Sequence, residues 1–129
     1  GIVGGDFGEE EWAVFKRHHI NTDDIEIVKD GKTFFWSGRY DYDMNTAHTL
    51  DTQLNVFETF QPKLSEESKN ARIVFLANIL PMLQKEVREQ CTKAEFVAMD
   101  TMNFWISSMK DKLIETIKVV DCIIINDAE

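Results

Sequence analysis

The sequence predicts an α/β fold, in which a partial Rossmann-like parallel sheet is flanked by helices and interrupted by a β-rich insertion. In the second half of the chain, short apolar segments alternate with segments of helical length, which is typical of parallel strands joined by helices. Between residues 26 and 57 the pattern instead becomes extended and aromatic. The chain has 129 residues, of which 43% are hydrophobic, and this is enough for one domain with a core.

The first segment, residues 1–25, is expected to form a strand followed by a helix. The strand is the short apolar stretch "GIVG". The helix is expected from Glu9 to His19, because the acidic turn "GEEEW" favours the positive end of a helix dipole.

Residues 26–57 are expected to form a β excursion, with Asp30-Gly31 as a hairpin turn. Side chains alternate between the two faces of a strand, so two sets of residues are expected to lie on opposite faces. One face carries the aromatic residues Phe34, Trp36, Tyr40 and Tyr42, and the other carries Phe35, Ser37 and Arg39.

Residues 58–129 are expected to form the alternating strand and helix core. Strands are predicted at "RIVFLANI", "AEFVAMD" and "DCIIIN". Helices are predicted at "PMLQKEVREQC", where Pro81 suits a first helical position, and at "FWISSMKDKLIETIKVV". Parallel strands with helical crossovers predict a sheet that is covered on both faces.

Polar residues follow each of these strands. Asn78, Asp100 and Asn126 stand at successive strand ends, and Asp127 and Glu129 come directly after. In an open parallel sheet the ligand crevice lies outside the carboxyl ends of the strands, and oxygen ligands suit magnesium with substrate phosphates. Each single residue also has an ordinary alternative role as a helix cap.

Charge and composition exclude several classes of partner. The formal net charge of −9 argues against binding to nucleic acid or to an anionic membrane surface. No apolar run approaches the roughly 18 residues of a membrane span. Cys91 and Cys122 lack a metal-binding or disulfide-framework spacing, which indicates reduced thiols and the cytoplasm.

Two motifs carry a resemblance to a known family. "GIVGGDFGEEEW" resembles the glycine-rich strand, turn and helix of the ribokinase-like, PfkB-type sugar and nucleoside kinases, and "NDAE" matches their N-x-x-E motif. The order of glycine turn, β-rich lid and alternating core also agrees. The resemblance covers essentially the whole chain but only the middle of the family's domain, so we expect an internal fragment.

The resemblance implies an ATP-dependent kinase that phosphorylates a hydroxyl of a sugar or nucleoside-like acceptor, with Mg²⁺ as cofactor. It implies that Asn126 and Glu129 help to organise magnesium, and that Asp100 and Asn126 lie near the ATP phosphates. For Asp100, capping of the helix at Phe104 is an equal alternative.

The same resemblance implies that the lid contacts the acceptor, and that a homodimer forms through the lid or an exposed sheet edge. The face that meets the acceptor carries either Phe35, Ser37 and Arg39 or Trp36 and Tyr40. The sequence does not decide between these two faces.

The family's G-A-G-D segment, which carries its catalytic Asp, does not occur in the sequence. No residue is therefore assigned a catalytic role, and the chain alone is expected to be inactive. The alternative function is a complete small α/β binding or interaction module with an aromatic hairpin as docking surface. The carboxylates alone are also compatible with a phosphate-metabolising enzyme that is not a kinase.

Overall fold

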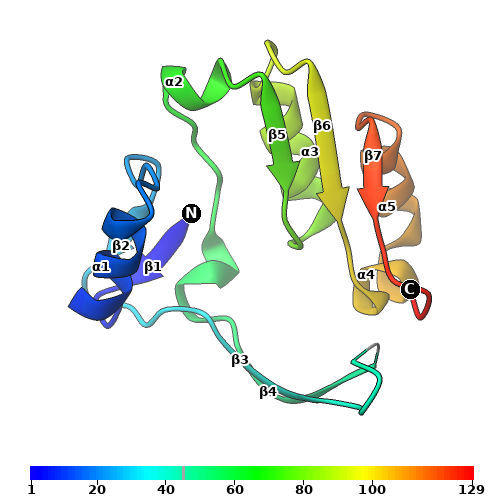
Figure 1. Ribbon diagram of the computed structural model, residues 1–129, viewed down its shortest axis with the longest axis horizontal. Coiled ribbons are helices and arrows are strands. Elements are labelled where there is room, and N and C mark those ends of the chain that lie inside the picture. The colour runs from blue at the N-terminus through cyan, green and yellow to red at the C-terminus, as the bar shows by residue number, and fades with distance from the viewer. Residues whose placement is uncertain (45) are drawn as a thin grey trace. The chain divides into compact units, whose positions relative to one another are not determined.

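The computed structural model describes residues 1–44 and 46–129 and divides the chain into two compact units (Figure 1). Unit 1 comprises Gly1–Gln61 and unit 2 comprises Pro62–Glu129. None of the helices in the described ranges is long and apolar enough to cross a bilayer.

Unit 1 begins with a strand, a helix and a second strand: β1 (Ile2–Gly4), α1 (Glu9–Arg17) and β2 (Glu26–Val28). The predicted first strand and helix are confirmed. Strand β2 pairs in parallel with β1, with Ile2 opposite Glu26. The ring of Trp12 in α1 packs against the ring of Phe7, which precedes the helix, with 4.9 Å between the ring centroids.

The expected hairpin turn at Asp30-Gly31 is wrong. The chain does turn there, since the Gly31 amide donates to the Val28 carbonyl at 3.0 Å, but β2 pairs with β1 and not with the strand that follows. The Gly5 amide donates to the Gly31 carbonyl at 3.1 Å, so the turn lies against the end of β1. A Cβ on Gly5 would lie 2.1 Å from the Lys29 carbonyl oxygen, and only glycine allows this approach.

The antiparallel hairpin of unit 1 lies further along the chain and consists of β3 (Phe35–Tyr40) and β4 (Ala47–Gln53). Phe35 pairs with Gln53, and the register shifts between Ser37 and Gly38. The 3-10 helix η1 (Asn55–Thr59) follows the hairpin. A β-rich excursion is therefore present, but β2 belongs to the parallel pair.

Unit 2 contains a parallel sheet of β5 (Ile73–Leu76), β6 (Phe96–Asp100) and β7 (Cys122–Ile124) in that order (Figure 1). All three predicted strands are confirmed. Strand β6 is central and pairs with both neighbours.

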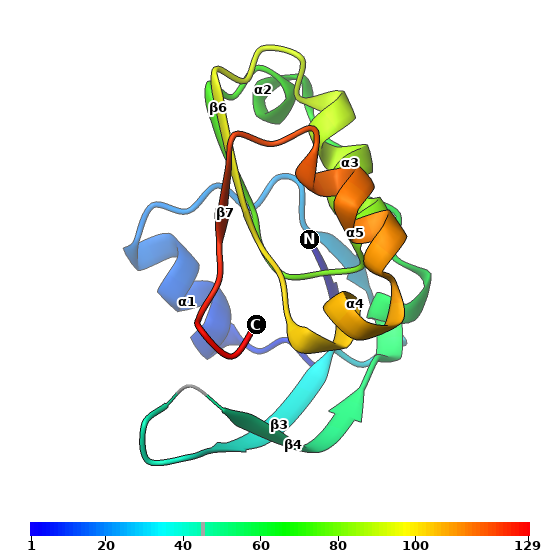
Figure 2. The same ribbon diagram turned by 90° about the vertical axis from the view of Figure 1, so that its right-hand side faces the viewer.

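The helices of unit 2 pack on one face of this sheet, as Figure 2 shows for α3 (Pro81–Gln90) and α5 (Lys110–Ile117). The core between them consists of Leu76, Val97, Met99 and Leu113. The opposite face is not covered by a helix of unit 2. Its exposed apolar side chains are Ile73, Phe75, Phe96 and Ile124.

The single helix predicted over 104–120 is interrupted. It is divided at Met109, with φ −137° and ψ 36°, into α4 (Asn103–Ser108) and α5. The Ser107 hydroxyl donates to the Asn103 carbonyl at 2.8 Å, and the Ser108 hydroxyl donates to the Phe104 carbonyl. Such bonds to the preceding turn compete with the helical ladder, which accounts for the interruption.

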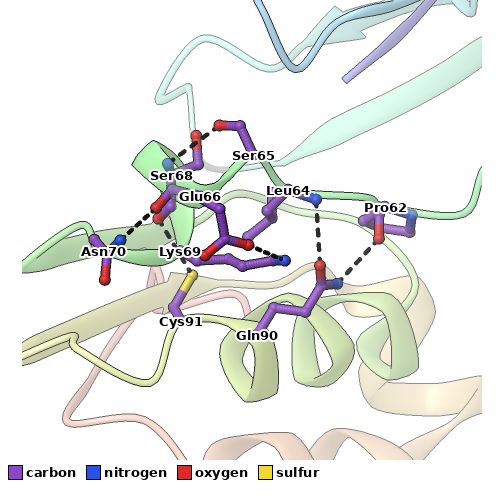
Figure 3. A network of polar contacts seen from close by, with 9 residues as sticks. All are labelled: Pro62, Leu64, Ser65, Glu66, Ser68, Lys69, Asn70, Gln90 and Cys91. Atoms are coloured by element: carbon purple, nitrogen blue, oxygen red, sulfur yellow. Dashed lines mark hydrogen bonds and ion pairs between the residues drawn. The ribbon is translucent and has the colours of Figure 1, made fainter.

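The segment that opens unit 2 is fixed to α3 by side-chain hydrogen bonds (Figure 3). The Gln90 amide nitrogen donates to the Pro62 carbonyl at 3.0 Å, and the Leu64 amide donates to the Gln90 carboxamide oxygen at 3.2 Å. The short helix α2 (Glu66–Lys69) follows. Its N-cap Ser65 accepts from the Ser68 amide at 3.3 Å, a contact typical of helix starts.

Candidate functional site

The carboxyl ends of β5, β6 and β7 bring a set of polar side chains to one edge of the sheet of unit 2. Asp100 is the last residue of β6, while Asn78 and Asn126 each follow their strand by two residues. Because the three strands are parallel and adjacent, these residues lie at the same edge, as the sequence predicts.

Gln84 of α3 ties two of these strand ends together. Its side chain is 1% exposed, and its amide nitrogen donates to the carbonyls of Leu76, Ala77 and Asp100 at 3.0, 3.1 and 3.0 Å. Gln84 was not among the residues predicted from the sequence to form a site. One feature of the sequence does indicate its role. Gln84 stands beside Leu83 on the buried face of α3, where a polar side chain needs hydrogen-bond partners.

Asp100 sits in an environment that disfavours its charge. Burial raises the pKa of its carboxyl group above the ordinary value, and the nearby Glu129 carboxylate raises it further. Asp100 Oδ1, Thr101 Oγ1 and Gln84 Oε1 are buried and have no hydrogen-bond partner among the described residues. The end of β6 thus presents polar atoms that an added ligand or water can satisfy.

The structure does not support the capping alternative for Asp100. The N-cap position of α4 is occupied by Met102 and not by Asp100, and Met102 makes no side-chain capping hydrogen bond.

Asn126 and Glu129 are brought together in a turn after β7. The Asn126 amide donates to Glu129 Oε2 at 3.1 Å, and the Glu129 amide donates to the Asn126 carbonyl at 3.2 Å. Asn126 Oδ1 accepts from the Ala128 amide at 2.9 Å. The N-x-x-E spacing therefore folds into one compact element, with both side chains bonded to its backbone.

Asn78 is held by other side chains at the same edge. Its Oδ1 accepts from the Trp105 indole nitrogen at 3.0 Å, and its Nδ2 lies 3.2 Å from the Met102 sulfur. Both ends of the amide are engaged, so its role in this structure is to position α4.

The donor set at this edge suits a hard cation that keeps much of its own coordination shell. Asp100, Asn126 and Glu129 offer oxygen atoms, and the orphaned Asp100 Oδ1 is one of them. Across the described residues, no three His, Cys, Asp or Glu side chains are grouped closely enough to enclose a metal. These side chains do not enclose a metal by themselves, so a cation at this edge needs water or phosphate ligands as well.

Unit 1 contains an open pocket of about 470 Å³. It is lined by Asp6, Phe7, Glu11, Lys32, Thr33, Phe34, Phe35, Gln53 and Asn55. This size lies within the usual range of small-molecule sites. Of the five lid residues singled out from the sequence, Phe35 lines the pocket and the other four are not part of its lining.

The other predicted face of the lid forms an aromatic cluster. The rings of Trp36 and Tyr40 lie 6.3 Å apart, and the Trp36 indole nitrogen donates to Thr49 Oγ1 at 3.2 Å. The indole also lies over Gly38, where a Cβ would meet it at 2.2 Å. Ser37 and Arg39 lie between these aromatics along β3, and Ser37 pairs with Asp51 of β4.

The pocket includes residues that were not predicted from the sequence to form a site, chiefly Thr33, Gln53 and Asn55. The Thr33 amide and hydroxyl both donate to Asp6 Oδ1, each at 2.7 Å. These hydrogen bonds lower the pKa of Asp6, and its carboxyl group is therefore ionised at neutral pH. Asp6 and Thr33 are far apart in the sequence, so no local pattern reveals their pairing.

Comparison with solved structures shows a ribokinase-like fold. The chain matches the nucleoside kinase of Burkholderia thailandensis in complex with inosine, with a TM-score of 0.74 and 12% identity over 100% of this chain. It matches the nucleoside kinase of Methanocaldococcus jannaschii, described as an archaeal member of the ribokinase family, with a TM-score of 0.73 and 19% identity over 98% of this chain.

The ligand-free form of the Burkholderia enzyme gives a TM-score of 0.63 and 10% identity over 99% of this chain. This chain spans 42% of the length of each of these kinases. No protein-family model and no curated protein matches the sequence. The predicted resemblance to ribokinase-like kinases is thus confirmed at the level of the fold.

Proposed function

We propose that this chain is a fragment of an ATP-dependent kinase that phosphorylates a hydroxyl group of a sugar or nucleoside-like small molecule. The observation that carries the proposal is the Asn126–Glu129 turn at the end of β7, in a chain whose whole length follows the ribokinase-like fold.

The strand ends of unit 2 supply the phosphate side of this function. Mg²⁺ bound with ATP would neutralise charge on the phosphates during transfer. Glu129 and Asn126 would hold the hydrated cation, and Asp100 and Asn126 would lie beside the phosphates. Burial raises the pKa of the Asp100 carboxyl group, and a bound cation would favour its ionised form.

The lid and pocket of unit 1 supply the acceptor side. Phe35 lines the pocket, which favours the face of Phe35, Ser37 and Arg39 for the acceptor. Trp36 and Tyr40 then belong to the other face, where a second copy could pair with the lid. Cys91 and Cys122 are both free thiols, consistent with a cytoplasmic kinase.

Under this proposal the 129-residue chain does not catalyse phosphoryl transfer by itself, because the G-A-G-D segment does not occur in its sequence. The test compares the 129-residue chain with the longer protein encoded by the natural reading frame, each assayed with magnesium, ATP and a panel of sugars and nucleosides. We expect transfer in the longer protein only.

Glu129→Gln in the longer protein should lower kcat about tenfold or more, as expected when charge near transferring phosphates is altered. Glu67→Gln is the matched control, since Glu67 is an exposed residue of α2. An inert longer protein, or equal activity of both variants, would contradict the proposal.

A binding or interaction module is the second candidate, and the exposure of the hairpin aromatics favours it. Phe35, Trp36 and Tyr40 are 49%, 37% and 48% exposed, and Tyr42 is fully exposed. Exposed aromatic clusters often mark protein interfaces. Under this alternative the longer protein shows no transfer to any acceptor, and Trp36→Ala weakens association.

A further inference from the structure

Thr33 lines the pocket of unit 1 and is the centre of a hydrogen-bond network. Its hydroxyl donates to Asp6 Oδ1 and accepts from the Gly4 amide at 3.0 Å. Its carbonyl accepts from the Asn55 side-chain nitrogen at 2.8 Å. Three backbone or side-chain partners therefore fix Thr33, and through it they fix the Asp6 carboxylate in a single orientation.

The Asp6 carboxylate is held by hydrogen bonds and keeps some capacity to accept another. Oδ1 accepts both hydrogen bonds from Thr33, and the carboxylate also accepts from its own backbone amide. A carboxylate has roughly four acceptor positions, so about one is left for a ligand. A carboxylate held in this way can accept a hydrogen bond from a ligand hydroxyl or amino group without first being reoriented.

The charges around the pocket are unequal. Its lining carries two carboxylates, Asp6 and Glu11, and one ammonium group, Lys32. Lys32 acts on Asp6, whose pKa it helps to lower. Glu11 Oε2 would lie 2.8 Å from a Cβ on Gly8, at the start of α1. One negative charge of the lining is therefore left uncompensated by the other lining residues.

Aromatic rings supply the apolar part of the same pocket. The lining contains the rings of Phe7, Phe34 and Phe35 together with the polar residues Asp6 and Thr33. A pocket that joins aromatic walls to a fixed hydrogen-bond acceptor suits a ligand with a ring face and a hydroxyl or amino edge.

We propose that this pocket binds the phosphate acceptor and selects one without a negative charge, so that sugars or nucleosides already carrying a phosphate are rejected. The Asp6 carboxylate receives a hydrogen bond from the acceptor, and Glu11 repels an anionic group. This inference rests on the proposed kinase function and adds the charge class of its acceptor.

The experiment measures binding to the 129-residue chain by NMR, with matched pairs of probes: uridine against uridine monophosphate, and ribose against ribose phosphate. The readout is the shift of the Thr33 amide and of the Asn55 side-chain NH₂ signals. We expect the neutral probe of each pair to bind about tenfold or more tightly than its phosphate ester, by charge repulsion at short range.

Two variants test the cause. Glu11→Lys should reverse or abolish the preference for the neutral probe, and Asp6→Asn should weaken binding of the neutral probe at the same signals. Glu89→Lys is the control, because it makes the same charge change at an exposed position of α3. The preference should be unchanged in this control.

Equal or tighter binding of the phosphate esters would overturn the inference, and so would the absence of shifts at Thr33 and Asn55 with every probe. The outcome is separable from that of the kinase proposal. Neutral-probe binding with no transfer by the longer protein refutes the kinase alone, whereas transfer to phosphorylated acceptors refutes the charge selection alone.

Discussion

The Gln84 side-chain nitrogen lies 3.0 Å from the Asp100 carbonyl oxygen and donates a hydrogen bond to it. This contact joins a helix of unit 2 to the end of its central strand, at the residue that we propose to lie beside the ATP phosphates. The same nitrogen also reaches the Leu76 and Ala77 carbonyls, so one amide sets the relative position of two strand ends.

Replacing Gln84 by methionine should destabilise the chain by about 2 to 4 kcal/mol, because buried carbonyls lose their donor while the side-chain volume is kept. Urea denaturation followed by circular dichroism measures the change. Gln61→Met, at an exposed loop position, is the control. A loss in Gln84→Met no larger than in the control would show that the contact contributes nothing measurable.

Asp100→Asn should stabilise the folded chain at neutral pH. The pKa of Asp100 is raised in the folded state, chiefly by burial and then by Glu129, so ionisation of this group opposes folding. The cost is absent below the unfolded pKa of about 4, grows as pH rises toward the folded pKa, and stays constant above it. Urea midpoints between pH 3 and pH 8 should therefore diverge as the pH rises, and a constant difference would contradict the raised pKa.

Thr116→Val should cost about 1 to 2 kcal/mol, since it removes a buried hydrogen bond between two helices. Thr116 of α5 is fully buried, and its hydroxyl donates to the Pro81 carbonyl of α3 at 2.8 Å. Thermal unfolding checks the prediction beside Thr92→Val, where the threonine is exposed. Equal melting temperatures for the two variants would argue against a stabilising contact between the helices.

Thr33→Val should raise the pKa of Asp6 toward its ordinary value, because the side-chain hydrogen bond from Thr33 is the largest cause of its lowering. A depressed carboxyl pKa stabilises the fold above the unfolded pKa, and this contribution is lost as pH falls through the folded value. NMR titration of the Asp6 carboxyl carbon measures the shift directly. An unchanged Asp6 midpoint would contradict the pairing.

The sequence was sufficient to predict the parallel core of unit 2, because continuous apolar runs such as the one containing Val97 and Met99 are typical of buried parallel strands. It also placed the polar residues at the strand ends, since that position follows from strand direction alone. The motif resemblance, and not periodicity, singled out Asn126 and Glu129, and the turn that joins them is a finding of the structure.

Other features depend on contacts that a local pattern does not contain. The Asp30-Gly31 turn has the composition of a hairpin, but its partner strand was decided by the pairing of Ile2 with Glu26. The helix over 104–120 has a continuous pattern, yet serine hydroxyls bonded to the preceding turn interrupt it. The lining of the unit 1 pocket comes from three separate stretches of the sequence, residues 6–11, 32–35 and 53–55, so no local pattern predicts it.

The order of strands in the sheet of unit 2 has a consequence for synthesis. Strands β5, β6 and β7 stand in the sheet in the order in which they occur in the chain. Each new strand therefore docks on the one that left the ribosome just before it, and every pairing closes only a loop that contains the intervening helical segment. The sheet can therefore grow by addition at one edge during translation, because each new strand pairs with a strand that has already been synthesised.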